Sequence, residues 1–149
     1  MNEVVLDTET TGLSVKDGHR IVEIGCIELD NLIPTKNKFH CYLNPERKVS
    51  EKALEVHGYT DEFLARQNKF LEIVEQFLEF IKDKRLIIHN AEFDLSHLNN
   101  ELAILGKKKI GNENNLTLTF IANAICFIRS TVDKSSSSET IKVFPAALG

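Results

Sequence analysis

The chain has 149 residues, a formal net charge of −4 and an isoelectric point near 5.7. This length accommodates a single small domain and leaves no room for a second one. The acidic balance excludes broad electrostatic capture of a nucleic-acid duplex, so any contact with nucleic acid must be local.

The first expected element is a β-strand over residues 3–9, because the apolar run 4–6 leads into a group of turn-forming residues. Side chains two residues apart on a strand share a face, so Asp7 and Glu9 are expected to lie side by side, roughly 7 Å apart at the backbone. Two carboxylates that close are unfavourable without a positive charge, and a divalent cation is the usual occupant of such a site. The alternative is an exposed strand end with two solvated acids.

Two further strands are expected over residues 21–29 and 37–43, which with the first strand suggest an antiparallel meander. Glu23 and Glu28 interrupt the second strand and are expected to lie at an edge or to face solvent. Ser50 is suited to cap a short helix that ends near His57, with Gly58 behind it. A second helix follows, with an apolar stripe at helical spacing that is expected to lie in the core: Phe70, Val74, Phe77, Leu78 and Ile81.

A third carboxylate follows the next expected strand, residues 86–88. Asn90 is a good N-cap for a helix that runs to Leu105 and ends before Gly106. Asp94 lies in the first turn of that helix, beyond the carboxyl end of a strand, which is where α/β sheets place functional groups. It can therefore meet Asp7 and Glu9. The alternative is a first-turn aspartate that stabilises the helix dipole by perhaps ~0.5 kcal/mol. His97, one turn further on, is expected to be partly exposed.

Together these segments resemble the DEDDh family of 3′–5′ exonucleases, and within it the proofreading (epsilon) subunits of bacterial DNA polymerase III. The segment 7–12 (DTETTG) resembles the first exonuclease motif, and 89–94 (HNAEFD) resembles the second. The segments 19–25, 39–45 and 56–60 fit the same family in the same order. The resemblance covers residues 1–109 and implies a ribonuclease-H-like α/β fold, with a mixed central sheet, flanking helices and a truncated or irregular C-terminal part.

The resemblance also implies roles for individual residues. Asp7, Glu9 and Asp94 would be catalytic and would bind two Mg²⁺ or Mn²⁺ ions. The implied reaction is two-metal hydrolysis that removes nucleoside monophosphates from DNA 3′ ends during proofreading, with a replicative polymerase subunit as a possible partner. The residues that would contact the substrate are Thr10, Thr11, Gly12, His57 and Phe93.

The third motif of the family, a histidine followed five residues later by an aspartate, is not found. No histidine follows His97, and Asp133, the only later aspartate, has Ile128 five positions before it. No general base is therefore identified, and activity is expected to be impaired. Residues 110–149, which include four consecutive serines at 135–138, are expected to form an aberrant tail that is partly disordered or poorly packed. Out-of-frame translation, true divergence, and a substitute base or second polypeptide are competing explanations.

Two rival functions follow. One is a catalytically inactive remnant or non-catalytic module that binds a polymerase or a DNA end. The other is an oligoribonuclease-like RNA exonuclease, since the contacts to a 2′-hydroxyl cannot be read from the sequence. The three cysteines lack metal-type spacing, and residues 116–132 are too short and too polar to cross a membrane. A cytoplasmic location without a membrane partner is expected.

Overall fold

The computed structural model describes residues 2–111, which fold around a four-stranded sheet with the strand order β3-β2-β1-β4. The strands are β1 (Asn2–Thr10), β2 (Ile21–Asp30), β3 (Ile33–Tyr42) and β4 (Arg85–Ile88). β1 is antiparallel to β2 and β2 to β3, while β4 is parallel to β1. The predicted meander is confirmed. β3 begins four residues earlier than predicted because Asn31 and Leu32, both with positive φ, form a tight turn directly after β2.

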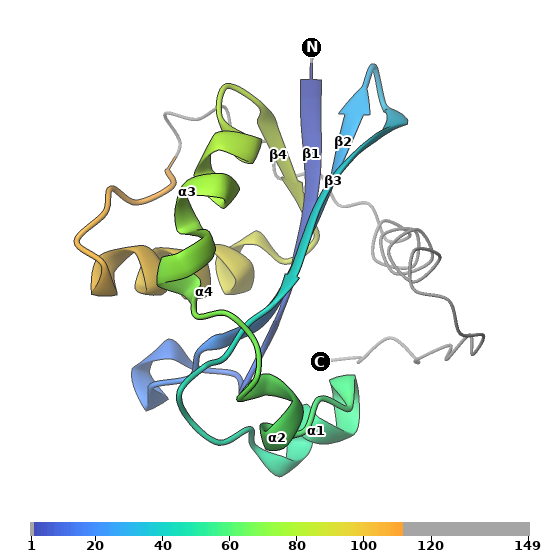
Figure 1. Cartoon of the computed structure of the whole chain (residues 1–149). Coiled ribbons are helices and arrows are strands. Elements are labelled where there is room, and N and C mark those ends of the chain that lie inside the picture. Colours follow the sequence, from blue (N-terminus) through green and yellow to red (C-terminus); the bar gives the residue numbers. More distant parts are fainter. Residues whose placement is uncertain (1, 112–149) are drawn as a thin grey trace.

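Two helices cover one face of this sheet, α3 (Phe70–Ile81) and α4 (Ala91–Ile104) (Figure 1). The apolar stripe predicted for α3 is buried against the sheet at Phe70, Val74, Phe77 and Ile81, with Leu78 packed at its edge. α4 is capped as predicted, because the Asn90 side chain accepts a hydrogen bond from the Phe93 N–H. The two helices and the inner face of the sheet enclose the main core.

Short helices lie beyond the end at which β1 finishes (Figure 1): η1 (Val15–Asp17), α1 (Glu51–His57) and α2 (Asp61–Leu64). The predicted caps of α1 are confirmed. The Ser50 hydroxyl accepts from the Ala53 N–H, and Gly58 ends the helix with a φ of 77°. These elements place the segments around residues 12 and 57 at the same end of the molecule.

The expectations for the side chains of Glu28 and His97 are wrong. Glu28 is only 6% exposed. It faces a set of donors (Asn2, Asn37 and Lys84) that together lower its pKa, chiefly through the hydrogen bond from Asn37. His97 is 1% exposed, because the face of α4 that carries it turns toward the rest of the protein.

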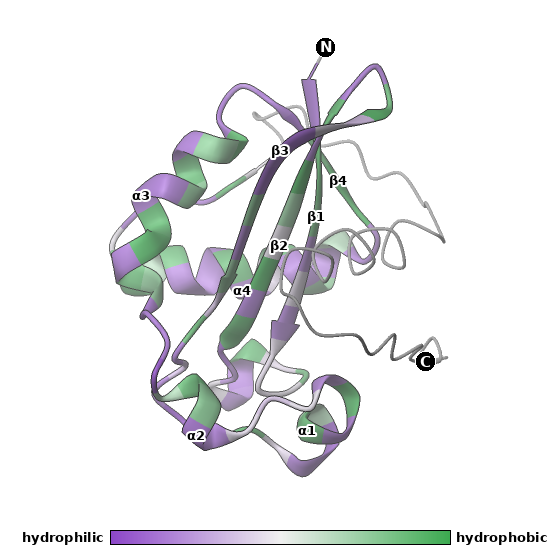
Figure 2. Ribbon diagram, turned by 45° about the vertical axis from the view of Figure 1, so that its right-hand side comes forward, coloured by the Kyte–Doolittle hydropathy of each residue, from purple (hydrophilic) through white to green (hydrophobic). Residues whose placement is uncertain are grey.

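Figure 2 shows the hydrophilic first half of the edge strand β3 beside the more hydrophobic β2.

The expected change of character at residue 110 falls almost entirely outside the described residues. Ile110 itself is buried in the main core, and the Asn99 side chain bonds both its N–H (2.8 Å) and its carbonyl (2.9 Å). The boundary between 109 and 110 and the serine run stay predictions. Cys26 and Cys41 are free thiols, and burial raises the pKa of both. Within residues 2–111, no helix has the length and apolar character needed to span a membrane.

Candidate active site

Asp7 and Glu9 lie near the carboxyl end of β1, and both are half-buried. In the register with β2, Asp7 is opposite Gly25 and Glu9 is opposite Glu23. Since alternate residues of a strand share a face, the two carboxylates project from the same side, as expected, and Thr8 projects from the other. The pairing shifts between Glu9 and Thr10, where the chain leaves the regular ladder and enters the turn at residues 10–12.

Asp94 is joined directly to the residue between these two acids. Its Oδ1 accepts a 3.0 Å bond from the Thr8 N–H and a 2.6 Å bond from the Thr8 hydroxyl. The reason is topological. β4 ends opposite Leu6, so the Thr8 N–H lies beyond the parallel ladder, and α4 begins where β4 ends. The structure therefore brings the third predicted carboxylate to the strand that carries the first two.

The Asp94 carboxyl is strongly perturbed by its surroundings. Burial raises the pKa of Asp94 to about 7, and the negative charge of Asp7 raises it further against the opposing hydrogen bonds from Thr8. Within residues 2–111, no three His, Cys, Asp or Glu side chains are gathered closely enough to hold a metal ion. What the site does provide is the buried carboxylate of Asp94, which the charge of Asp7 repels, and the half-buried carboxylates of β1. Such oxygen donors suit a hard divalent cation.

The turn after Glu9 is held by several hydrogen bonds. The Thr10 hydroxyl donates to the Gly12 carbonyl at 2.7 Å, and the Thr11 N–H donates to the Arg20 carbonyl at 2.8 Å. The Thr11 carbonyl accepts from the Ser50 N–H, the N-cap of α1, at 2.9 Å. Thr10 and Thr11 are buried. The predicted substrate-binding segment is thus an ordered turn, fixed to β2 on one side and to α1 on the other.

His57 contacts this turn through one ring nitrogen. Its Nδ1 accepts from the Tyr59 N–H at 3.0 Å, so Nε2 carries the proton and donates to the Thr10 carbonyl at 3.2 Å. The ring is stacked on Tyr59, with centroids 4.8 Å apart, and burial lowers the pKa of His57. Both nitrogens of the neutral ring are occupied by backbone groups. A nucleotide could therefore meet the His57 ring through its carbon atoms, with no proton transfer.

Phe93 lies in the first turn of α4, next to Asp94 and half-buried. Its ring packs on His97, with centroids 4.5 Å apart, and the Phe93 carbonyl accepts a 3.0 Å bond from His97 Nδ1. Phe93 is therefore set on the same helix end as the third carboxylate. Its predicted contact with the substrate stays a prediction.

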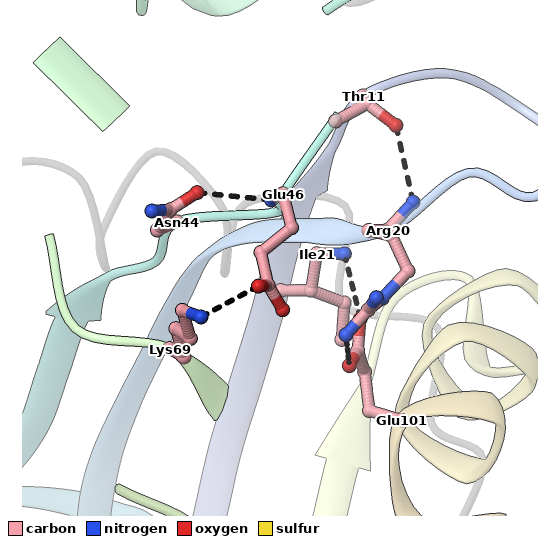
Figure 3. A network of polar contacts seen from close by, with 7 residues as sticks. All are labelled: Thr11, Arg20, Ile21, Asn44, Glu46, Lys69 and Glu101. Carbon is pink, nitrogen blue, oxygen red and sulfur yellow. Dashed lines mark hydrogen bonds and ion pairs between the residues drawn. The ribbon is translucent and has the colours of Figure 1, made fainter. Parts of the chain in front are cut away.

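Sequence reasoning missed the ion pair that fixes α4 to the start of β2 (Figure 3). The Arg20 guanidinium makes two 2.7 Å bonds to the carboxylate of Glu101, which is 2% exposed and also accepts from the Ile21 N–H. These bonds raise the pKa of Arg20. α4 is thus tied to the sheet at both Asp94 and Glu101. No local pattern pairs two residues 81 positions apart.

A second missed group surrounds Glu23, which was expected to lie at an edge or to face solvent. Its two carboxylate oxygens lie 2.7 Å from His40 Nε2 and 2.7 Å from the Tyr59 hydroxyl, which donates. Glu23 is opposite Glu9 in the sheet, and Tyr59 supports the His57 ring. The expectation of solvent exposure was wrong because β3 and the segment after α1 both supply partners for this side chain.

This geometry has a counterpart in known proteins. The sequence pattern that describes the exonuclease (RNase T) family matches residues 4–133. The chain belongs to the exonuclease family. The match includes β1 with Asp7 and Glu9, and α4 with Asp94, so the site lies within the family domain.

Relatives in bacteria agree with this assignment. DNA polymerase III subunit epsilon of Rickettsia typhi is 50% identical over 110 residues, which are 74% of this chain and 48% of that protein. The subunit of the same name from Buchnera aphidicola is 45% identical over 109 residues, or 70% of this chain and 46% of that protein. The chain spans about half the length of these relatives. The resemblance to proofreading subunits is confirmed for this part of the molecule.

Solved exonuclease structures share the fold. The nuclease domain of 3′hExo, a DEDDh family member bound to rAMP, superposes with a TM-score of 0.61 at 18% identity, over 72% of this chain and 60% of that one. E. coli exonuclease I in complex with a dA16 oligonucleotide gives a TM-score of 0.71 at 12% identity, over 85% of this chain and 30% of that one. The predicted α/β, ribonuclease-H-like architecture is confirmed.

Proposed function

We propose that this exonuclease-family chain acts on the 3′ end of a DNA strand and removes nucleoside monophosphates from it. The main support is the pair of hydrogen bonds from Thr8 to the Asp94 carboxylate. These bonds connect the second acidic motif to the strand that carries the first. The family match and the polymerase III epsilon relatives support this activity, as do the exonuclease structures with bound nucleic acid.

The carboxylate oxygens suit divalent metal ions, Mg²⁺ or Mn²⁺, and we propose that Asp7, Glu9 and Asp94 would hold them once a bound cation draws the three side chains together. A cation would offset the repulsion between Asp7 and Asp94 and favour the ionised form of Asp94, since with a pKa of about 7 the carboxyl is only partly ionised near neutral pH without a metal. When bound, the ions supply an activated water and stabilise the departing 3′ oxygen. The Thr8 bonds orient the Asp94 carboxylate, because both are accepted by the same oxygen.

The remaining predicted residues would bind and orient the terminal nucleotide. The turn of Thr10, Thr11 and Gly12 would lie against it, with the carbon edge of His57 on one side and Phe93 on the other. Neutral His57 cannot serve as the proton acceptor here without breaking the bond that its Nδ1 accepts from the Tyr59 N–H. The general base is therefore not assigned among the described residues, and we propose that hydrolysis by this chain is weak, since losing a general base typically costs about 10²–10⁴-fold.

A second candidate, favoured by the absence of a His-x₄-Asp pattern in the sequence, is a module that binds a DNA end or a polymerase without cleaving. The names of the epsilon relatives support association with a replicative polymerase. Action on replicating DNA would agree with the cytoplasmic location expected from the sequence.

The deciding experiment follows release of single nucleotides from 3′-labelled single-stranded DNA with Mg²⁺ or Mn²⁺. Asp7→Asn and Asp94→Asn should each abolish release, while Asp30→Asn, at the exposed far end of β2, should not change it. Binding of the labelled strand by the wild type without release would favour the binding module. Equal release from the matched RNA strand would contradict the preference for DNA, and no binding and no release would contradict both functions.

A further inference from the structure

Gly12 is a glycine because of an imidazole ring from elsewhere in the chain. A Cβ added at this position would lie 2.3 Å, 2.4 Å and 2.6 Å from three ring atoms of His19. The backbone does not require glycine, since Gly12 is not among the positive-φ residues, and an alanine could adopt its conformation. The ring of His19 therefore occupies the space that any other side chain at position 12 would need.

His19 is also bonded to the neighbouring residue of the same turn. Its Nδ1 lies 2.9 Å from the Thr11 hydroxyl oxygen, which in turn accepts a 3.1 Å bond from the Arg20 N–H. Burial lowers the pKa of His19, with help from the charge of Arg47. Whether the Thr11 hydroxyl or the ring N–H donates in this contact depends on the tautomer of the His19 ring. One imidazole thus contacts both Thr11 and Gly12.

The base of this contact is rigid. Arg20, the residue after His19, is held by the buried carboxylate of Glu101 on α4 (Figure 3). The Thr11 N–H bonds the Arg20 carbonyl, which fixes the turn to the same segment. His19 therefore precedes a residue that is bonded both to α4 and to the turn, so the position of its ring relative to the turn is fixed by these contacts.

We propose that His19 is a positioning residue of the nucleotide-binding turn: it holds Thr11 and Gly12 in the conformation that receives the 3′-terminal nucleotide. The identity of the ligand in this inference rests on the proposed function. The packing of the His19 ring against Gly12 does not depend on that function. No local pattern marked this histidine, because its two partners lie in a different segment of the chain.

A thermal-stability cycle tests the packing without any ligand. Gly12→Ala should lower Tm by about 5 °C or more in the wild-type background, because a methyl group would be forced into the ring. In the His19→Ala background the same change should lower Tm by less than about 2 °C, since the clash is gone. Equal losses in both backgrounds would overturn the inference. Should His19→Ala not fold, His19→Ser, which also lacks the ring, provides the reduced background.

Nucleotide binding tests the positioning. The probe is dTMP with Mn²⁺, titrated into the full chain. His19→Ala and His19→Phe should each weaken binding about tenfold, because both lose the bond to Thr11. His19→Asn, whose amide can occupy the place of Nδ1, should recover most of the affinity. Lys36→Ala, exposed on β3, serves as the control and should bind like the wild type.

The outcomes separate the two proposals. Unchanged dTMP affinity in His19→Ala would overturn the positioning role while leaving the proposed function intact. If the wild type binds no dTMP, the proposed function fails, and amide hydrogen exchange at Thr11 decides the positioning role together with the thermal cycle. Faster exchange in His19→Ala than in the wild type is expected, and equal exchange would overturn the inference.

Discussion

The hydroxyl of Thr8 donates a 2.6 Å hydrogen bond to the carboxylate of Asp94, across 86 residues of sequence. The bond places the buried carboxylate of α4 beside the strand that carries Asp7 and Glu9. It also explains why a threonine stands between the two acids. A valine would have the same shape but no donor, and the carboxylate would keep only the bond from the Thr8 N–H.

Thr8→Val is therefore expected to loosen the position of the Asp94 carboxylate, while the side-chain volume at position 8 stays the same. Unfolding free energy should fall by about 1–2 kcal/mol, the cost of losing a hydrogen bond to a buried charged group. Affinity for Mn²⁺ should fall about tenfold, as when a partner that orients a metal ligand is removed. Urea denaturation and calorimetric Mn²⁺ titration measure the two effects. Thr8→Ser keeps the hydroxyl, so a Ser variant as weak in Mn²⁺ binding as Val would argue against the role of the bond.

Asp94 is expected to make metal-free protein less stable as the pH rises. Its pKa is raised to about 7 in the folded state from an ordinary 3.8, so the folded state binds the proton more tightly than the unfolded state. Its stabilising contribution is full below about pH 4 and is lost as the pH rises through about 7.

Asp94→Asn cannot titrate but can still accept both Thr8 bonds. Without divalent metal it should be more stable than the wild type at pH 8, by on the order of 2 kcal/mol, with a smaller difference at pH 5. Urea denaturation at the two pH values measures this. Mn²⁺ should then stabilise the wild type and leave Asp94→Asn nearly unchanged. A difference that is the same at both pH values would mean that Asp94 does not titrate in this range.

The pair of Arg20 and Glu101 should behave as a buried ion pair. Glu101→Gln would leave the Arg20 guanidinium without its charge partner and is expected to cost about 3–5 kcal/mol of unfolding free energy. Glu79→Gln is the matched control, because Glu79 pairs with Lys82 on the surface, 3.6 Å apart, and such a pair is worth about 0–1 kcal/mol. Denaturant titration of both variants gives the comparison. If the two variants lose similar amounts of unfolding free energy, the pair of Arg20 and Glu101 contributes no more than a surface ion pair.

His57 should stay neutral and keep its proton on Nε2. Its Nδ1 accepts from the Tyr59 N–H and its Nε2–H donates to Thr10, while burial lowers its pKa. Protonation would turn Nδ1 into a donor that faces another donor. Nitrogen-15 NMR should therefore report the Nε2–H form and a midpoint below the ordinary 6.5. A ring that titrates above 6.5 would contradict these bonds and reopen a role for His57 in proton transfer.

Local pattern was sufficient for much of the fold. Alternation and apolar runs predicted the strands, and the caps at Ser50, Gly58 and Asn90 are contacts between residues a few positions apart, which the sequence displays directly. The stripe on α3 was readable for the same reason. Glu28 and His97 were misjudged because their burial depends on partners and packing that local pattern does not display, such as the Asn2 and Lys84 contacts of Glu28.

By itself, then, the sequence determined the elements, the two acidic motifs and the family to which they point, because each depends on spacing along the chain. Only the tertiary structure decided how the motifs meet. The N–H of Thr8 lies beyond the end of β4, so it donates its hydrogen bond to Asp94 instead of to a neighbouring strand. Glu101 binds Arg20, and the ring of His19 excludes a side chain at Gly12. These contacts join segments far apart in the chain, and packing of the whole domain determines which of them form.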